Sequence, residues 1–155
     1  MKKSLIFSVL LVILGIYLLD CTQKGSGRKY PEEIGEYSKY EVHSMPKCPS
    51  GMKSRDEIVY SGYQCTANVS VIIHETEQAS RMHFEQSKGS GYKEHYMGGL
   101  EGMYKSRTSD NTYSVSFGWR AGKTTIIINI FKQKDYGVEE QSEEELQLFI
   151  DSFKK

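Results

Sequence analysis

The sequence predicts an α+β fold, in which an antiparallel β-sheet of about four to five strands carries a C-terminal helix and one further helix on one face. Three observations predict it. Segments with alternating apolar and polar residues follow one another along the chain, as half-buried strands do. The last segment has the apolar spacing of a helix. The chain also has 11 tyrosines and 14 glycines, which favour sheet and turns.

The strongest strands form a predicted hairpin near the C-terminus. Between Thr112 and Trp119, large apolar residues alternate with small or polar ones, and the segment 124–132 (TTIIINIFK) is β-branched almost throughout. A turn at 120–123 joins the two, so we expect them to pair as an antiparallel hairpin. The run of isoleucines in the second strand predicts a central position in the sheet, partly buried on both faces.

Further strands are predicted before this hairpin. Alternation over 63–75 predicts a long strand, and residues 58–60 predict a short one. Glycines interrupt the segment 93–108, which predicts either one strand bent by a bulge or two short strands. Two prolines and several charged residues within 45–56 predict a loop.

Helices are predicted at three places. The C-terminal helix is predicted to start at Ser142, which forms a capping box with Glu145. A second helix is predicted over 76–88, where the hydroxyl of Thr76 can cap the first turn. A short third helix is predicted over 31–37, because proline and acidic residues suit a first turn. The C-terminal helix has a single apolar stripe, formed by Leu146, Phe149, Ile150 and Phe153.

The N-terminus has the pattern of an export signal. Met1-Lys2-Lys3 gives a cationic start, an apolar run extends to Leu19, and Asp20 and Cys21 follow. About fifteen apolar residues rise only about 22 Å as a helix, whereas a membrane span usually needs about 20 residues. The two lysines hold the N-terminus on the cytoplasmic side, so the rest of the chain is predicted to be exported.

The junction Leu18-Leu19-Asp20-Cys21 resembles the lipobox of bacterial lipoproteins, although Asp20 stands where that family has Gly, Ala or Ser. The resemblance implies that Cys21 carries a lipid such as palmitate, becomes the new N-terminus and anchors the chain to a membrane of the cell envelope. Thr22 follows the cysteine instead of the aspartate that retains many lipoproteins in the inner membrane, so the outer membrane is favoured over the inner one. An uncleaved signal anchor is the alternative.

The predicted organisation therefore has three parts. Residues 1–20 are the signal peptide, residues 21–29 are a flexible, polar tether, and residues 30–155 form a single α+β domain. The domain is expected to face the periplasm or the exterior.

Cys48 and Cys65 remain as an even pair of cysteines in an oxidising compartment, which predicts a disulfide between them. In the chain-entropy model such a crosslink stabilises the fold by about 3 kcal/mol. The alternative is two free, buried thiols.

Composition and motifs exclude several classes of function. The chain has 20 basic and 20 acidic residues, so there is no electrostatic basis for nucleic-acid binding. The segment 118–124 has three residues between its glycines, where a phosphate-binding loop needs four, and a strand is predicted after it. No pair of histidines has the spacing of a zinc-protease helix, and no G-x-S-x-G is present. No metal ion, cofactor or catalytic residue is therefore predicted.

A binding function is the leading hypothesis. We expect a non-enzymatic, membrane-tethered interaction domain that binds a protein, a peptide or another component of the envelope. An alternative is a periplasmic carrier or sensor of a small hydrophobic ligand, with a pocket under the C-terminal helix. An enzyme would need a cleft that brings together residues such as His74, His83 and Glu75. The predicted binding surface is aromatic and consists of Tyr96, Tyr104, Tyr113 and Trp119.

Overall fold

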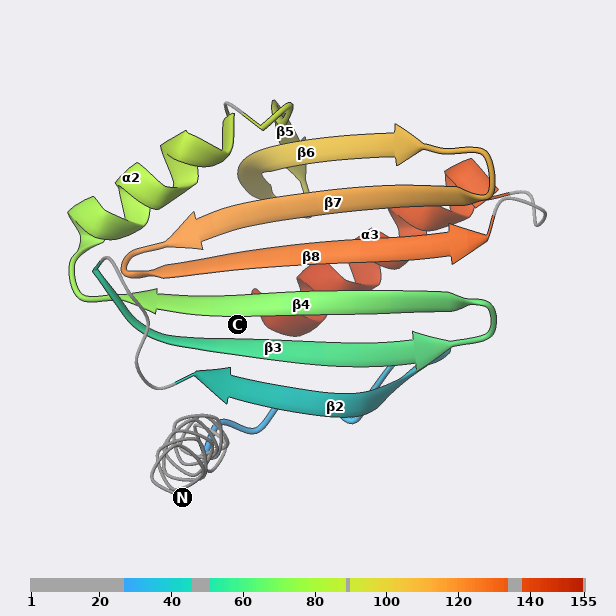
Figure 1. Cartoon of the computed structure of the whole chain (residues 1–155), viewed down its shortest axis with the longest axis horizontal. Helices are drawn as coiled ribbons and strands as arrows, with labels where there is room; N and C mark the ends of the chain where they lie inside the picture. Colours follow the sequence, from blue (N-terminus) through green and yellow to red (C-terminus); the bar gives the residue numbers. More distant parts are fainter. Residues whose placement is uncertain (1–26, 46–50, 89, 134–137, 155) are drawn as a thin grey trace, which may run out of the picture.

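The structure is a computed structural model that describes residues 27–45, 51–88, 90–133 and 138–154 (Figure 1). Eight strands of these residues form one antiparallel sheet, in the order β1-β2-β3-β4-β8-β7-β6-β5. The strands are β1 (Glu33–Ile34), β2 (Tyr37–Met45), β3 (Met52–Gly62), β4 (Cys65–His74), β5 (Lys93–Met97), β6 (Leu100–Thr108), β7 (Thr112–Ala121) and β8 (Thr124–Gln133). The two described helices are α2 (Glu77–Lys88) and α3 (Val138–Phe153).

The centre of the sheet confirms the strongest predictions from sequence. β7 and β8 form the expected hairpin, and β8 lies between β7 and β4. β4 and β8 pair from Cys65–Lys132 to Ile73–Thr124, so both strands are hydrogen-bonded on each side. This position explains the β-branched sequence of β8, because a central strand has packed neighbours on both of its edges.

Helix α3 covers one face of the sheet and closes the main core on that side. Leu146, Phe149 and Ile150 are fully buried against the sheet, as the apolar stripe predicts. Phe149 packs edge-to-face against Tyr37 and Tyr60, with ring centroids 5.1 and 5.3 Å apart. The sheet contributes the alternate residues of β3, β4, β7 and β8 that face this helix, among them Ile58, Val69, Val115, Phe117, Ile128 and Ile130.

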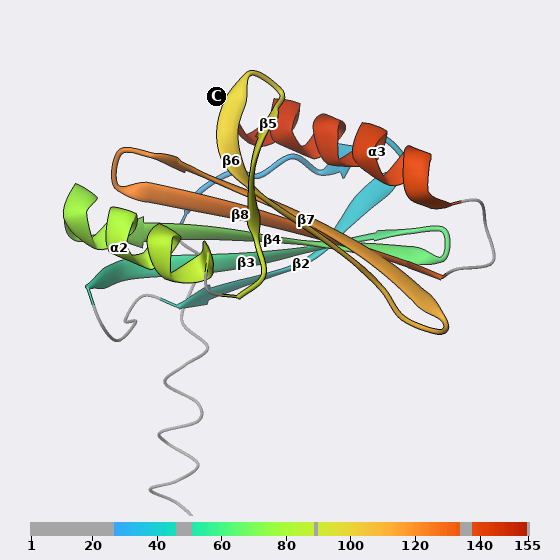
Figure 2. The same cartoon turned by 90° about the horizontal axis from the view of Figure 1, so that it is seen from above.

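Helix α2 lies on the opposite face of the sheet, at one end of β4, β7 and β8 (Figure 2). The prediction that both helices share one face is therefore wrong. The buried contact between Ser80 of α2 and Thr125 of β8 holds the helix on this face, and local sequence pattern does not reveal it. The cap is confirmed, since the amide of Ala79 donates to the Thr76 hydroxyl at 3.0 Å.

The prediction of four to five strands is too low, and the N-terminal half accounts for much of the difference. Residues 31–37 form a tight hairpin, not a helix, in which Ile34 pairs with Tyr37 and Gly35 has φ of 57°. The predicted loop over 45–56 is also wrong in part, because β3 begins at Met52.

The segment 93–108 forms two strands, which was one of the two predicted alternatives. Gly98 and Gly99 join β5 to β6 with φ of 61° and 81°, values in the left-handed region that glycine adopts without strain. Helix α3 also differs from its prediction, since it begins at Val138 and leaves Ser142 fully buried inside the helix. Ser142 therefore lies past the first turn, so the predicted capping box is not the helix start.

Candidate functional site

Among the described residues, α3 lies on one face of the sheet, and the other face is covered only at one end, by α2 (Figure 2). We call this surface the open face. Its side chains alternate with those of the core on β3, β4, β8 and β7, and they include Val59, Thr66, Asn68, Ser70, Ser114, Ser116, Ile127, Asn129 and Phe131.

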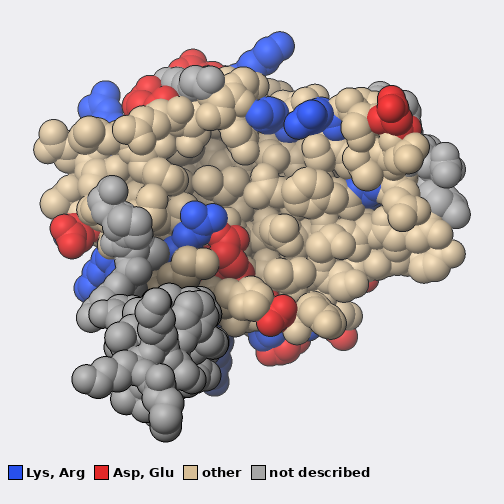
Figure 3. Space-filling view, in the orientation of Figure 1, with Lys and Arg blue, Asp and Glu red and all other residues tan. Residues whose placement is uncertain are grey.

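Away from the end that α2 covers, the three central strands of the open face carry no charged side chain, and the nearest basic residues on this face are Lys105 and Arg107 of β6, opposite Ser116 and Ser114. On this face, the residues are Ser, Thr, Asn, Gly or apolar from Thr66 to Ile72 of β4, from Ile127 to Phe131 of β8 and from Ser114 to Gly118 of β7. Figure 3 shows the same surface as a broad area without acidic or basic residues. Solvated faces of antiparallel sheets are common, but a polar face without charge over several strands also suits contact with another molecule.

Hydrogen bonds between neighbouring strands hold this face in place. The Ser116 hydroxyl donates to the side-chain oxygen of Asn129 at 2.7 Å. Asn129 also lies opposite Asn68 in the register of β4 and β8. Phe131 is 43% exposed on the same face and provides an apolar, aromatic contact surface beside these amides.

An ion pair borders the open face on β3. Arg55 and Glu57 lie two residues apart on the same side of the strand, and their side chains are paired. The hydroxyl of Ser70 donates to both oxygens of the Glu57 carboxylate, at 2.9 and 2.8 Å. The charges of Arg55 and Glu57 thus offset each other, and the Ser70 hydroxyl of β4 adds hydrogen bonds to the carboxylate. This ion pair therefore adds little net charge to the edge of the open face on β3.

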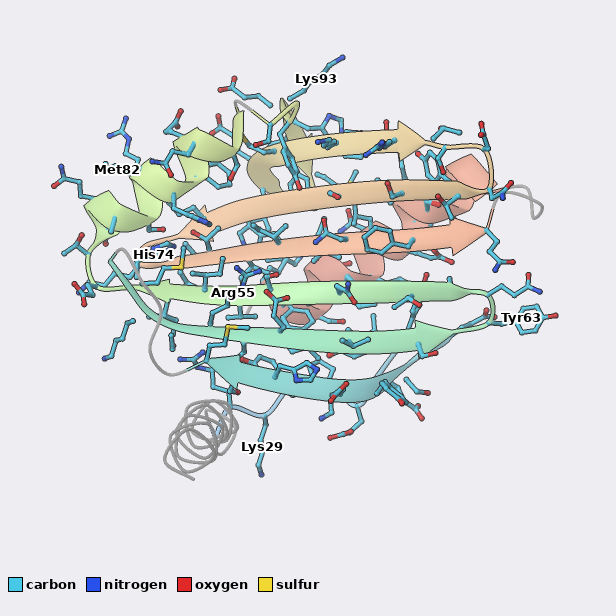
Figure 4. All side chains as sticks on the ribbon, viewed as in Figure 1. Lys29, Arg55, Tyr63, His74, Met82 and Lys93 are labelled. Atoms are coloured by element: carbon cyan, nitrogen blue, oxygen red, sulfur yellow. The ribbon has the colours of Figure 1, made fainter. Side chains whose placement is uncertain are left out.

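Two histidines meet where α2 covers the end of the open face. The rings of His74 on β4 and His83 on α2 have centroids 5.2 Å apart, and His74 is 1% exposed. The Thr125 hydroxyl lies 3.2 Å from Nε2 of His74 and 3.2 Å from the hydroxyl of Ser80. Figure 4 shows His74 at the end of β4, on the strand next to the one that carries Arg55.

Burial lowers the pKa of both histidines. For His74 the main cause is removal of the ring from water, and the neighbouring His83 lowers its pKa further. For His83 the main cause is again burial, and the positive charge of Arg55 acts in the same direction. Both rings are therefore neutral at pH 7.

This histidine pair does not form the catalytic or metal cluster that an enzyme would need. Glu75, the third residue considered from sequence, is exposed. Among the described residues, no group of three or more His, Cys, Asp or Glu side chains is arranged to hold a metal ion.

The predicted aromatic binding surface is not assembled. Tyr113 and Trp119 face α3 and are 8% and 2% exposed, so they belong to the core. Tyr104 lies on the same side, with its hydroxyl oxygen 3.5 Å from a carboxylate oxygen of Glu143 on α3. Tyr96 is 71% exposed but points to the other face of the sheet. Cross-strand partners share a face, and Tyr104 pairs with Lys93, which lies three residues before Tyr96 on β5 and therefore on the opposite side of that strand. The strand alternation that distinguishes these residues in the sequence thus places Tyr113 and Trp119 inside the fold and leaves Tyr104 partly buried beside α3.

Cys65 carries a free thiol, and Cys48 lies outside the described residues. Cys65 begins β4, whereas the amide of Glu75, just past the end of β4, bonds to Gly51. At about 3.3 Å per residue, these ends of β4 are about 30 Å apart, and the three residues from Gly51 back to Cys48 reach at most about 11 Å. A disulfide needs Cα atoms within about 7 Å, so the paired strands weigh against the predicted Cys48–Cys65 bridge.

The last residues of the predicted tether are part of the folded domain. Arg28 donates to the carboxylate of Asp56 at 3.1 Å, and the hydroxyl of Tyr30 donates to the same oxygen. Asp56 is fully buried on β3. The ring of Tyr30 also stacks on Phe153 at the end of α3, with centroids 6.0 Å apart.

The export signal and Cys21 lie outside the described residues. Within the part of the chain that the structure describes, neither helix combines the length and the apolar character that crossing a membrane requires.

No family model matches the chain, and no curated protein is similar to it in sequence. Among solved structures, the extracellular domain of PknH from Mycobacterium tuberculosis is similar with a TM-score of 0.41 and 12% sequence identity. The match covers 70% of this chain and 68% of that chain. The function of this chain is therefore inferred from its own residues.

Proposed function

We propose that this chain is an exported, lipid-anchored lipoprotein of the bacterial cell envelope, whose domain binds a protein or peptide partner through the open face. The uncharged sheet surface carries the proposal of binding. The export pattern and Cys21 support the location, because they place a lipid anchor directly before the domain. The proposed function is non-enzymatic.

The tether would hold the domain close to the membrane. Because Arg28 is fixed to Asp56, only residues 22–27 separate the lipid-bearing cysteine from the folded domain. The seven steps from Cys21 to Arg28 span at most about 25 Å when fully extended. The partner is therefore expected within about that distance of the membrane, either in the membrane itself or in the adjacent envelope.

The chemistry of the open face favours a partner segment without net charge. Asn68, Asn129 and the surrounding hydroxyls offer both donors and acceptors, while Val59, Ile127 and Phe131 offer apolar contact. A charged side chain placed over β4, β8 and the centre of β7 would lose water without gaining an ion pair there, which disfavours it; Lys105 and Arg107 border this area on β6. A polar, uncharged peptide segment with an apolar residue against Phe131 suits the face best.

The carrier hypothesis has no support from the core under α3. The space between α3 and the sheet is filled by side chains, of which Tyr60, Phe117 and Phe149 are the largest and are fully buried. An open depression of about 640 Å³ lies instead along the outer side of α2, where Arg81, Met82 and Arg120 contribute to its lining. A ligand-carrying cavity is expected to be enclosed, whereas this depression is open to solvent and has the charged residues Glu77, Arg81, Glu85 and Arg120 in its lining.

Cys21→Ser tests the anchor. Cells fed radiolabelled palmitate are expected to label the wild-type chain in the membrane fraction, whereas the Cys21→Ser chain is expected to carry no label and to keep its signal sequence. Cys65→Ser serves as the matched control, because it also removes a thiol but leaves the lipobox-like junction intact, and it is expected to label like wild type. An unlabelled wild-type chain, or an intact wild-type chain recovered from the cytosol, would reject the proposed anchor.

A further inference from the structure

The contact of helix α2 with the sheet contains a buried polar cluster beside the buried apolar side chains Ile72 and Met103. Ser80, which is fully buried, bonds to Thr125 of β8, and Thr125 bonds to His74 of β4. His83 lies one turn further along the helix and stacks near the His74 ring. Met82 of the same helix is 56% exposed and faces away. The attachment of α2 therefore differs from that of α3, which buries three apolar side chains completely.

The two imidazoles have no acidic partner at this contact. Neither ring forms a hydrogen bond or ion pair with a described carboxylate, and Nδ1 of His83 is buried with no hydrogen-bond partner among the described residues. A neutral ring tolerates this environment at a modest cost. A protonated His83 ring would place a charged donor at Nδ1, where no acceptor is present among the described residues, which costs considerably more.

The surrounding charges make protonation less favourable still. Arg55 on β3 acts directly on His83, and the carboxylate of Glu57 beside it is already engaged by Arg55 and Ser70. On β7, Arg120 lines the depression on the outer side of α2, together with Glu77, Arg81 and Glu85 of the helix itself. Two protonated histidines 5.2 Å apart would thus repel each other and Arg55.

We propose that α2 is an acid-sensitive latch over one end of the open face: when His74 and His83 take up protons, the helix detaches from the sheet while α3 and the sheet stay folded. Detachment uncovers Thr125 and its neighbour Ile72, both fully buried on this face in the structure, and so enlarges the surface. The role of the latch in binding rests on the proposed function, but the detachment itself does not.

The sign of the effect follows from the direction of the two pKa shifts. Both pKa values in the docked state lie below the ordinary histidine value of 6.5. The detached state therefore binds protons more readily, so docking is fully favoured above about pH 6.5 and weakens as pH falls below it. When both histidines take up a proton on detachment, the ratio of docked to detached helix falls by up to about 100-fold per pH unit. This slope applies at pH values between the pKa of the histidines in the detached state and their lower pKa in the docked state.

Hydrogen–deuterium exchange of the full chain in detergent tests the latch. Protection of the α2 amides, corrected for the intrinsic pH dependence of exchange, is expected to fall at least about tenfold between pH 7.5 and 5.0. Protection of α3 and β8 is expected to stay constant. The variant His83→Gln keeps a polar side chain that does not titrate. Because His74 still titrates, mainly through its own burial, the fall in α2 protection between pH 7.5 and 5.0 is expected to be smaller in this variant than in wild type. The double variant His43→Gln, His95→Gln removes two exposed histidines and is expected to behave as wild type.

Three results would overturn the proposal. One is unchanged α2 protection in the wild-type chain down to pH 5.0, and another is loss of protection in α2 and α3 together, which would indicate global unfolding. The third is a loss of α2 protection at acid pH that is as large in His83→Gln as in wild type. If His83→Gln already lacks α2 protection at pH 7.5, a second variant, Thr125→Val, takes its place in the test. Thr125→Val removes the hydroxyl link between His74 and Ser80 and must weaken α2 protection at neutral pH; otherwise the latch is rejected. No partner takes part in these measurements, so they leave the binding proposal to its own test.

Discussion

Phe149→Ala is expected to lower the free energy of unfolding by about 3–5 kcal/mol. The side chain lies in the C-terminal half of α3, is fully buried and packs against Tyr37 and Tyr60, which belong to β2 and β3. The truncation removes a large apolar group and leaves a cavity that the two tyrosine rings fill only in part. Urea denaturation, followed by tryptophan fluorescence, measures the change, since Trp119 is 2% exposed in the native state.

Leu148→Ala is the matched control for this measurement. Leu148 precedes Phe149 on the same helix but is 47% exposed, so its truncation is expected to change the free energy of unfolding by less than about 1 kcal/mol. Equal losses from the two substitutions would contradict the placement of α3 on the sheet.

Arg28→Ala is expected to cost about 2–3 kcal/mol, although it lies in a segment that the sequence predicts to be a flexible tether. Asp56 is fully buried, and removing Arg28 takes away a charged donor from its carboxylate. Breaking a fully buried ion pair costs about 3–5 kcal/mol, and the loss here is expected to be smaller because the Arg28 side chain is 34% exposed.

A double-mutant cycle isolates this contact. Lys29→Ala, which removes the exposed neighbouring charge, is expected to leave the free energy of unfolding within about 0.5 kcal/mol of wild type. In the background Asp56→Asn, Arg28→Ala is expected to cost much less than in the wild-type chain, since no buried charge is left unpaired. Equal costs in both backgrounds would show that Arg28 does not stabilise Asp56, and that residues 28–29 belong to the tether after all.

Periodicity in the sequence predicted the elements that depend on local pattern. β4, β7 and β8 alternate regularly because one face of each strand packs against α3, and α3 itself shows the spacing of its buried residues. Both patterns can be recognised without knowing the partner element. The placement of β8 at the centre of the sheet followed from its isoleucines for the same reason.

Elements that depend on distant partners could not be predicted in this way. The first residues of β3 look like a loop because they are charged, yet Asp56 is buried by Arg28 and Tyr30 from a remote segment. In β2 the alternation breaks where the register shifts between Lys39 and Glu41. The lack of charge on the open face is visible in the sequence, but which face α2 covers depends on the tertiary contact between Ser80 and Thr125.

The meeting of His74 and His83 shows the same limit at the candidate site. Their proximity was foreseeable as a consequence of α2 folding back on β4, whereas the buried hydroxyls around them were not. The aromatic residues selected from sequence were misleading, because large aromatic side chains on regular strands are more often part of a core than of a binding surface.

Site-specific photo-crosslinking tests the central claim, which is that the open face of an exported domain binds an envelope partner. A benzophenone amino acid replaces Phe131 on the open face or, as a control, Leu148 on the outer side of α3; the two side chains are similarly exposed, at 43% and 47%. The proposal predicts a discrete adduct from position 131 in the membrane fraction, none from position 148, and loss of the adduct when Asn129→Arg places a charge on the face. No adduct from position 131, equal adducts from both positions, or an adduct that persists in a folded Asn129→Arg chain would contradict it.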